Sequence, residues 1–318
     1  MPLTFGRAPG KIILFGEHAV VYGQPAIAMP VTKVNATARV VPDFEGTRGQ
    51  IRIQSPDVGL DADLKNLPEN HPLSKAIALT LAAISPTHTP ALTLQISSTI
   101  PVSAGMGSSA AISVAIIRSL SNFLGQPLSA SEISDLAYEV EKIHHGTPSG
   151  IDNNVIAHNK PVYFMRDKPI EFLKIKSPTH WVVADTGEKK STLEMVSSVR
   201  ALHAADENRT GKIFRKIGEI VRQARITLED ADLETLGELM NENQRLLEKL
   251  NVSSSGLNHL IETARTAGAA GAKLSGGGGG GNLIALAAPE IIETVDKALT
   301  DAGAKRTITT QLSSSEMP

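Results

Sequence analysis

The sequence predicts an α+β protein of two domains, with a boundary near residue 178. The first part reads as strands followed by a strand–loop–helix unit, and the pattern changes near Trp181. The second part follows the order strand, helices, strand, strand, helix, strand, which is the order of a split βαβ, ferredoxin-like domain. We therefore expect an N-terminal domain over residues 1–178 and a C-terminal domain over residues 179–318.

The elements expected in the N-terminal domain follow from hydrophobic periodicity and from helix start signals. Residues 109–124 read as a buried helix, and a further helix opens at the capping box of Ser129 and Glu132. The expected strands are apolar, β-branched or alternating runs at residues 11–15, 32–41 and 92–97.

In the C-terminal domain, Ser191 and Glu194 form a second capping box. Apolar residues at helical spacing predict helices at residues 192–250, with breaks, at 256–266 and at 290–302. Strands are expected at residues 181–185, 272–274, 282–287 and 306–312.

Composition excludes several classes of protein. Apolar residues make up 41% and charged residues 20%, so the chain can form cores and is not of the disordered type. The net charge of −2, without a run of Lys or Arg, argues against nucleic acid as a partner. The absence of cysteine excludes thiolate catalysis. Because no apolar run or signal core stands out, we expect a cytoplasmic protein without a membrane partner.

Residues 101–111, Pro-Val-Ser-Ala-Gly-Met-Gly-Ser-Ser-Ala-Ala, join an expected strand to an expected helix. The first amides of a helix have no internal partner, and the helix dipole adds partial positive charge there. Gly105 and Gly107 allow the backbone to approach an anion, and Ser108 and Ser109 add hydroxyls suited to a phosphate oxygen or Mg²⁺. The segment therefore predicts a phosphate-binding loop.

Two other loop types are disfavoured. The segment lacks the Gly-x-x-x-x-Gly-Lys-Ser/Thr of a Walker loop. It matches the Gly-x-Gly-x-x-Ala of a dinucleotide fingerprint, which also needs an acidic residue closing the next strand about 20 residues on. Here the loop is followed by two expected helices, and Glu132 serves as a helix cap. A dehydrogenase is therefore the weaker interpretation.

The second motif spans residues 9–23, where a Pro-Gly turn puts Lys11 at the start of a strand. The polar trio of Gly16, Glu17 and His18 interrupts an apolar stretch. A hairpin with solvated charges is the alternative. Charged residues clustered between buried runs favour a functional site.

The third motif joins a helix to a tight turn. Glu141 lies at the border of the apolar stripe of the helix, and Asp152 follows a Pro-Ser-Gly turn. Two carboxylates around such a turn can serve one site, one for Mg²⁺ and one for a hydroxyl proton, although Asp152 alone also suits an ordinary turn. His144 and His145 are adjacent on the helix and do not easily share a metal, so we interpret them as structural.

Six glycines, residues 276–281, lie between two short expected strands. A flexible linker is one interpretation of such a run. Its position between strands favours a tight loop that needs unusual backbone angles.

Together these motifs resemble those of the galactokinase–homoserine kinase–mevalonate kinase–phosphomevalonate kinase superfamily, the GHMP kinases. The three signature regions, residues 9–23, 101–111 and 273–281, occur in the expected order, and the resemblance covers essentially the whole chain. It implies a GHMP kinase fold, with an N-terminal ribosomal-protein-S5-domain-2-like domain and a C-terminal ferredoxin-like domain. It also implies ATP-dependent transfer of a phosphate to an alcohol.

Within the superfamily, residues 10–23, 145–153 and 185–192 resemble mevalonate kinases most closely. This resemblance implies transfer of the ATP γ-phosphate to the 5-hydroxyl of mevalonate, in the route to isoprenoids. The third signature departs from that family at Gly277, where Ala is usual, and at Asn282, where Cys is usual. Neither departure removes a catalytic group.

The resemblance also implies roles for single residues. Lys11 and Asp152 are the catalytic pair, and Asp152 accepts or orients the proton of the attacking hydroxyl. Ser109 and Glu141 hold Mg²⁺. The implied substrate-binding residues are Glu17, His18, Ser149, Asp152 and Thr192. The implied ATP-binding residues are Lys11, Pro101, Val102, Ser103, Ala104, Gly105, Met106, Gly107, Ser108, Ser109, Ala110, Ala111, Gly276, Gly277 and Gly278.

Two alternatives stay open from the sequence. The first is another GHMP small-molecule kinase, such as a phosphomevalonate kinase. The second is a kinase-fold ligand sensor without activity. A sensor is expected to have lost Lys11, Asp152 or the Mg²⁺ ligands, and all of them are present. The expected partners are ATP and mevalonate, and the resemblance allows a homodimer.

Overall fold

A computed structural model describes residues 4–101, 105–145, 148–188 and 190–313 of the chain. The chain forms two compact units, and neither is a single stretch of sequence. Unit 1 contains Met1–Lys11, Val34–Val102 and Met106–Asn159, and unit 2 contains Ile12–Lys33, Ser103–Gly105 and Lys160–Pro318.

This division differs from the predicted boundary near residue 178. Strand β1 (Thr4–Phe15) passes from unit 1 into unit 2, and strand β2 (Ala26–Pro42) passes back. Because two paired strands run through both units, no single cut in the sequence separates them.

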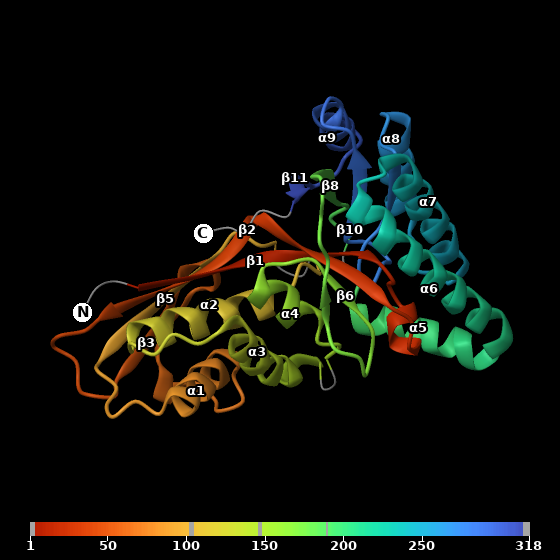
Figure 1. The fold of residues 1–318 in the computed structure, drawn as a ribbon. Helices are drawn as coiled ribbons and strands as arrows, with labels where there is room; N and C mark the ends of the chain where they lie inside the picture. The colour runs from red at the N-terminus through yellow and green to blue at the C-terminus, as the bar shows by residue number, and fades with distance from the viewer. Residues whose placement is uncertain (1–3, 102–104, 146–147, 189, 314–318) are drawn as a thin grey trace. The chain divides into compact units, whose positions relative to one another are not determined.

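Unit 1 combines a sheet with four helices. The sheet order is β4-β3-β5-β2, with β1 also paired to β2, and β3 runs parallel to β5 while β2 runs antiparallel to it. Helices α1–α4 pack on one another along these strands (Figure 1), and α2 contacts β5. The strands are β3 (Ile51–Ser55), β4 (Leu60–Asp63) and β5 (Leu92–Ser98). The helices are α1 (Pro72–Ile84), α2 (Ser108–Phe123), α3 (Ala130–His145), α4 (Ile151–His158) and the 3₁₀ turns η2 (Pro56–Val58) and η3 (Leu64–Asn66).

Small side chains bring α2 close to β1. A Cβ on Gly6 of β1 would overlap the carbonyl oxygen of Ala115 and lie 2.6 Å from the nitrogen of Ser119. Only glycine therefore permits this approach of strand to helix backbone. The contact fixes β1 against the helix that begins at the predicted phosphate-binding loop.

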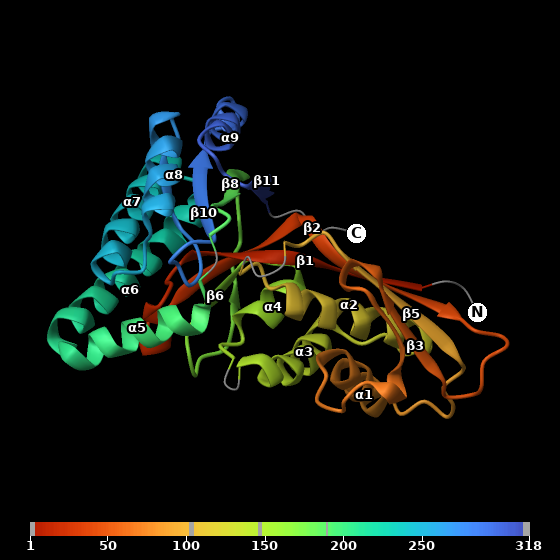
Figure 2. The same cartoon turned by 180° about the vertical axis from the view of Figure 1, so that it is seen from behind.

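Unit 2 is built on a four-stranded antiparallel sheet in the order β11-β8-β10-β9. This order confirms the predicted ferredoxin-like arrangement. Helices α7, α8 and α9 pack on the sheet (Figure 2). The strands are β8 (Thr179–Asp185), β9 (Gly271–Leu274), β10 (Asn282–Ala287) and β11 (Arg306–Leu312). The helices are η1 (Ala19–Tyr22), α5 (Thr192–Ala205), α6 (Glu207–Asp230), α7 (Leu233–Lys249), α8 (Ser255–Thr266) and α9 (Ile292–Asp301).

The first half of β2 pairs with β6 (Val162–Phe164), which pairs with β7 (Glu171–Phe172). These two short strands, together with α1, α4, β3 and β4, were not expected from the sequence. The strands predicted at residues 282–287 and 306–312 are confirmed at both ends. Both capping boxes are also confirmed.

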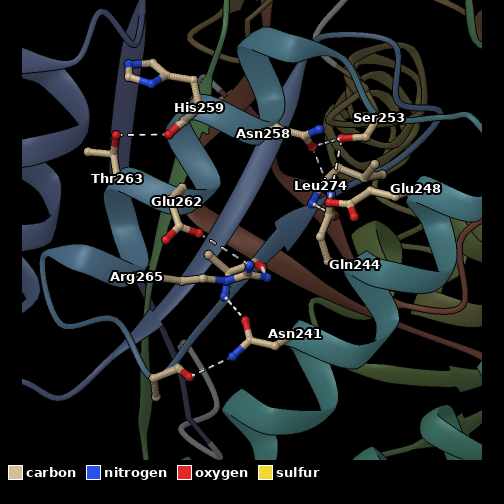
Figure 3. Close-up of polar contacts among 12 residues, drawn as sticks. Asn241, Gln244, Glu248, Ser253, Asn258, His259, Glu262, Thr263, Arg265 and Leu274 are labelled. Atoms are coloured by element: carbon tan, nitrogen blue, oxygen red, sulfur yellow. Dashed lines mark hydrogen bonds and ion pairs between the residues drawn. The ribbon is translucent and has the colours of Figure 1, made fainter.

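Strand β9 lies at the edge of the unit 2 sheet, and side chains from α7 and α8 cover its free side (Figure 3). Asn241 accepts a hydrogen bond from the Ala272 N–H at 3.2 Å, and Gln244 accepts one from the Leu274 N–H at 3.0 Å. Arg265 donates to the Ala272 carbonyl at 2.8 Å. These bonds satisfy backbone groups that an edge strand normally leaves open.

Among the described residues, no helix combines the length and the apolar character needed to cross a membrane.

Candidate functional site

In unit 1, Lys11 and Asp152 form an ion pair. The Lys11 Nζ lies 3.0 Å from the Asp152 Oδ1, and the two side chains are 7% and 29% exposed. Lys11 comes from β1, and Asp152 lies in the first turn of α4, which follows Gly150 in a left-handed conformation. The sequence predicted only a turn here. A helix N-terminus adds partial positive charge, which favours a carboxylate at this position.

Gly107, the second glycine of the predicted phosphate-binding loop, lies against this ion pair. Gly107 has φ +69°, and a Cβ there would lie 3.0 Å from the Lys11 Cγ and 3.4 Å from the Asp152 Oδ2. The Lys11 N–H also donates to the Met106 carbonyl at 3.0 Å. Helix α2 starts at Ser108, so its first amides lie beside a lysine and an aspartate.

The other residues of the predicted loop differ in whether their side chains and amides are accessible to a phosphate. Gly105 is exposed, and Ser108 and Ser109 are partly exposed. The side chains of Met106, Ala110 and Ala111 are buried in the core. The Ala111 N–H donates to the Gly107 carbonyl inside the helix, so this amide does not offer a bond to phosphate. Pro101 is partly exposed, and Val102, Ser103 and Ala104 lie outside the described residues.

Arg118, which the sequence analysis missed, joins the elements that carry the ion pair. It lies on α2 and donates to the Arg7 carbonyl of β1 at 2.6 Å and to the Ala157 carbonyl of α4. Burial lowers the pKa of its guanidinium. The sequence did carry a signal for Arg118, because it is the only charged residue among residues 108–123. A lone cation in a buried helix must find partners nearby.

Ser109 and Glu141 offer the oxygen donors that Mg²⁺ requires. Ser109 lies in the first turn of α2, and Glu141 is 4% exposed on α3, which packs against α2. No group of three or more His, Cys, Asp or Glu placed to hold a metal ion occurs in the described part of the chain. Such a sparse set of hard donors fits Mg²⁺, which binds one or two carboxylates and completes its shell with phosphates and water. The side chains of His144 and His145 lie outside the described residues.

In unit 2, the glycine run forms a hydrogen-bonded loop between β9 and β10. The Ser275 N–H donates to the Asn282 carbonyl at 2.9 Å and closes its base. The Gly279 N–H donates to the Val252 carbonyl at 2.7 Å, and the Gly281 N–H donates to the Glu188 carbonyl at 3.0 Å. Five of the six glycines have positive φ, and Gly277 is the exception. The run is therefore a folded loop and not an extended linker.

Glu17 and His18 are buried beside this loop. Glu17 is 1% exposed and forms an ion pair with Lys273, whose side chain is fully buried. Burial raises the pKa of Glu17, and the positive charge of Lys273 only partly opposes this rise. Burial likewise lowers the pKa of Lys273, and the negative charge of Glu17 only partly opposes this fall. The His18 Nε2 lies 2.9 Å from the Gly277 carbonyl oxygen, and burial lowers its pKa.

The substrate-binding role expected for Glu17 stays a prediction. Its carboxylate is buried and forms an ion pair with Lys273. Lys273 was noted only as the first residue of a signature. Its position in a short strand before a glycine run carried no sign of a distant carboxylate.

Thr192 and Ser149 lie at helix starts. Thr192 is exposed at the first position of α5, and a Cβ on Gly277 would lie 3.2 Å from its Oγ1. The Ser149 Oγ accepts a bond from the Ile151 N–H at 3.3 Å at the start of α4. Thr192 is therefore next to the glycine loop, and Ser149 supports the turn that presents Asp152.

Comparison with known proteins identifies the class. Residues 72–159 match the family model described as the GHMP kinases N terminal domain, and residues 200–304 match the GHMP kinases C terminal. The chain belongs to the GHMP kinases.

Its most similar relatives include the protein named mevalonate kinase of Thermococcus gammatolerans, which is 38% identical over 96% of this chain and 95% of that protein. The fold is similar to the crystal structure of the Methanococcus jannaschii mevalonate kinase, with a TM-score of 0.85, 29% identity and coverage of 98% of both chains. It is also similar to the L. major mevalonate kinase in complex with R-mevalonate, with a TM-score of 0.82, 29% identity and coverage of 100% of this chain and 97% of that one.

Proposed function

We propose that this chain is an ATP-dependent mevalonate kinase, which transfers the γ-phosphate of ATP to the 5-hydroxyl of (R)-mevalonate and releases ADP and 5-phosphomevalonate. The observation that carries the chemistry is the Lys11–Asp152 ion pair, which lies against Gly107 where α2 begins. The substrate is supported by the similarity to proteins named mevalonate kinase over nearly the whole chain.

Phosphoryl transfer proceeds through a loose transition state, so it needs positioning and charge neutralisation more than a strong base. Lys11 and the first amides of α2 supply positive charge for the phosphate oxygens. Asp152 accepts or orients the proton of the attacking hydroxyl. The new bond joins the substrate oxygen to the γ-phosphorus, and the bond from that phosphorus to the β,γ-bridging oxygen breaks.

Ser109 and Glu141 are the residues that would hold Mg²⁺, which when bound neutralises charge on the phosphates. In unit 2, we assign the backbone of residues 276–278 to the ATP phosphates. His18 and Thr192 flank that loop and are assigned to the substrates.

The test is ATP turnover against a panel of alcohols: (R)-mevalonate, phosphomevalonate, galactose and homoserine. We expect turnover with mevalonate to exceed that with the others. Asp152→Asn should lower kcat by about 10²–10⁴-fold, the range for a positioned acid–base group. Asp135→Asn, the same change at an exposed position of α3, is the matched control.

Preference for galactose or homoserine would replace the substrate and keep transfer to an alcohol, whereas preference for phosphomevalonate would make a phosphate group the acceptor. No turnover with any alcohol would favour the ligand sensor. A near-normal kcat for Asp152→Asn would remove Asp152 from the mechanism.

A further inference from the structure

The base of the glycine loop is bonded to the C-terminal end of β1. The Ser275 Oγ donates to the Ile13 carbonyl at 2.7 Å and accepts from the Ile13 N–H at 3.2 Å. Both residues belong to unit 2 and are separated by 262 positions in the sequence. One serine thus satisfies both backbone groups of a β1 residue and holds the loop base in register with it.

Lys273, two residues before Ser275, extends this link into the core. Its side chain is fully buried, and its ammonium group contacts the Glu17 carboxylate, the Leu274 carbonyl at 2.6 Å and the ring of Phe15 at 5.9 Å from the centroid. A buried ion pair is weak evidence for stability, because desolvation of both charges offsets their attraction. Stability alone therefore does not explain why the Lys273–Glu17 ion pair lies beside the loop.

The segment Gly16–His18 continues the link along the loop. Burial raises the pKa of Glu17, and the charge of Lys273 opposes that rise. The next residue, His18, contacts the loop directly, since its Nε2 lies 2.9 Å from the Gly277 carbonyl oxygen. Lys273 and Gly277 are thus contacted by two consecutive residues.

The opposite side of β9 is fixed as well. Asn241 and Gln244 of α7 bond to the backbone of β9 up to Leu274 (Figure 3). Gln244 is fully buried, and it also donates to the Ser253 Oγ at 3.1 Å. Strand β9 therefore enters the glycine run with its backbone held on both sides.

We infer that Lys273 is a positioning residue for nucleotide binding. Its ion pair with Glu17 holds residues 276–278 in the conformation that receives the ATP phosphates, and Glu17 acts through this loop and not on the alcohol substrate. The inference rests on the proposed function, because it takes the loop to contact ATP.

The experiment compares the wild type with two variants. Lys273→Met/Glu17→Leu replaces the pair by apolar side chains of similar volume, a change that often leaves stability intact. Glu17→Gln keeps the volume and removes only the charge. For each protein, calorimetry gives the Kd of a non-hydrolysable ATP analogue with Mg²⁺, kinetics give the KM for ATP and for (R)-mevalonate, and thermal unfolding gives Tm.

We expect both variants to raise the Kd of the analogue and the KM for ATP by roughly 10-fold to 100-fold, the range for residues that orient a ligand through another group. The KM for mevalonate should change by less than about 2-fold, because the pair does not touch the alcohol. Leu299→Ala is the control for destabilisation alone, since Leu299 is fully buried on α9. It should lower Tm and leave the Kd of the analogue unchanged.

An unchanged Kd in both variants, or a raised KM for mevalonate with an unchanged Kd, would overturn the inference. If the double variant does not fold, Glu17→Gln alone decides. A wild type that binds the analogue but does not phosphorylate mevalonate would refute the proposed substrate and leave this comparison valid.

Discussion

Gly107→Ala tests whether the phosphate-binding loop and the ion pair act as one unit. Gly107 has φ +69°, and Gly105 two residues earlier has φ +68°. A Cβ on Gly107 would lie 2.9 Å from the Ile156 Cδ1 and 3.0 Å from the Lys11 Cγ, whereas a Cβ on Gly105 would meet no atom of the described residues within 4 Å. The two substitutions therefore share a backbone cost and differ in steric contact.

The expected magnitudes follow from this difference. A non-glycine residue in the left-handed region costs roughly 1–2 kcal/mol, so both variants should lose similar stability. The new methyl at position 107 must also push the Lys11 stem, and a misplacement of about 1 Å at a reacting group can cost ~10²-fold in rate. We expect Gly107→Ala to lower kcat by about 10-fold to 10²-fold and Gly105→Ala to change kcat far less.

The assay is kcat with saturating ATP and (R)-mevalonate, measured beside Tm. Gly125→Ala is the control for the backbone cost outside the loop. Gly125 has φ +75°, and a Cβ there would meet no atom of the described residues within 4 Å. Equal kcat for the variants at positions 105 and 107 would refute the reasoning. So would a kcat loss in Gly125→Ala as large as that in Gly107→Ala.

Three further predictions concern other parts of the site. Glu141→Gln should raise the Mg²⁺ concentration needed for half-maximal turnover, because it removes an anionic oxygen ligand; an unaltered titration would exclude Glu141 as a ligand. Gly278→Ala should lower Tm and weaken ATP use more than Gly276→Ala, because its Cβ would overlap the Val252 carbonyl oxygen while position 276 has open space; equal effects would mean that this overlap does not matter. Burial lowers the pKa of His18 below its usual 6.5, so the unfolded chain binds more protons there, and the free energy of unfolding should fall as pH drops below about 6.5. His18→Asn, which tolerates the local φ of 61°, should reduce that slope between pH 7.5 and 5.5 in urea titrations, and an identical slope would contradict this.

The elements that the sequence predicted well depend on signals between near neighbours. Residues 108–123 form a helix because buried small and branched residues follow a glycine turn, and the capping boxes of α3 and α5 form within four residues. The ferredoxin-like order of unit 2 follows from strands that were each apparent on their own. The family motifs added the substrate class, which no periodicity contains.

The short elements escaped prediction for a physical reason. Strands β6 and β7 have three and two residues, too few to show a period; β6 forms on the edge of β2, and β7 forms on the edge of β6. Helix α4 has eight residues, and its start after a Pro-Ser-Gly turn read as the end of structure. Its existence changes Asp152 from a turn residue into the first-turn residue of a helix.

The tertiary structure alone decided which charges meet. Asp152 was expected near Lys11 only through family resemblance, and nothing in the local pattern around Lys273 indicated a partner 256 positions away in Glu17. A charged residue between apolar neighbours looks the same in sequence whether it reaches solvent or a distant carboxylate. Within unit 1 the fold brings Lys11 of β1 to Asp152 of α4, and within unit 2 it brings Glu17 to Lys273 of β9. Local sequence does not encode such non-local contacts, because each depends on how distant segments pack.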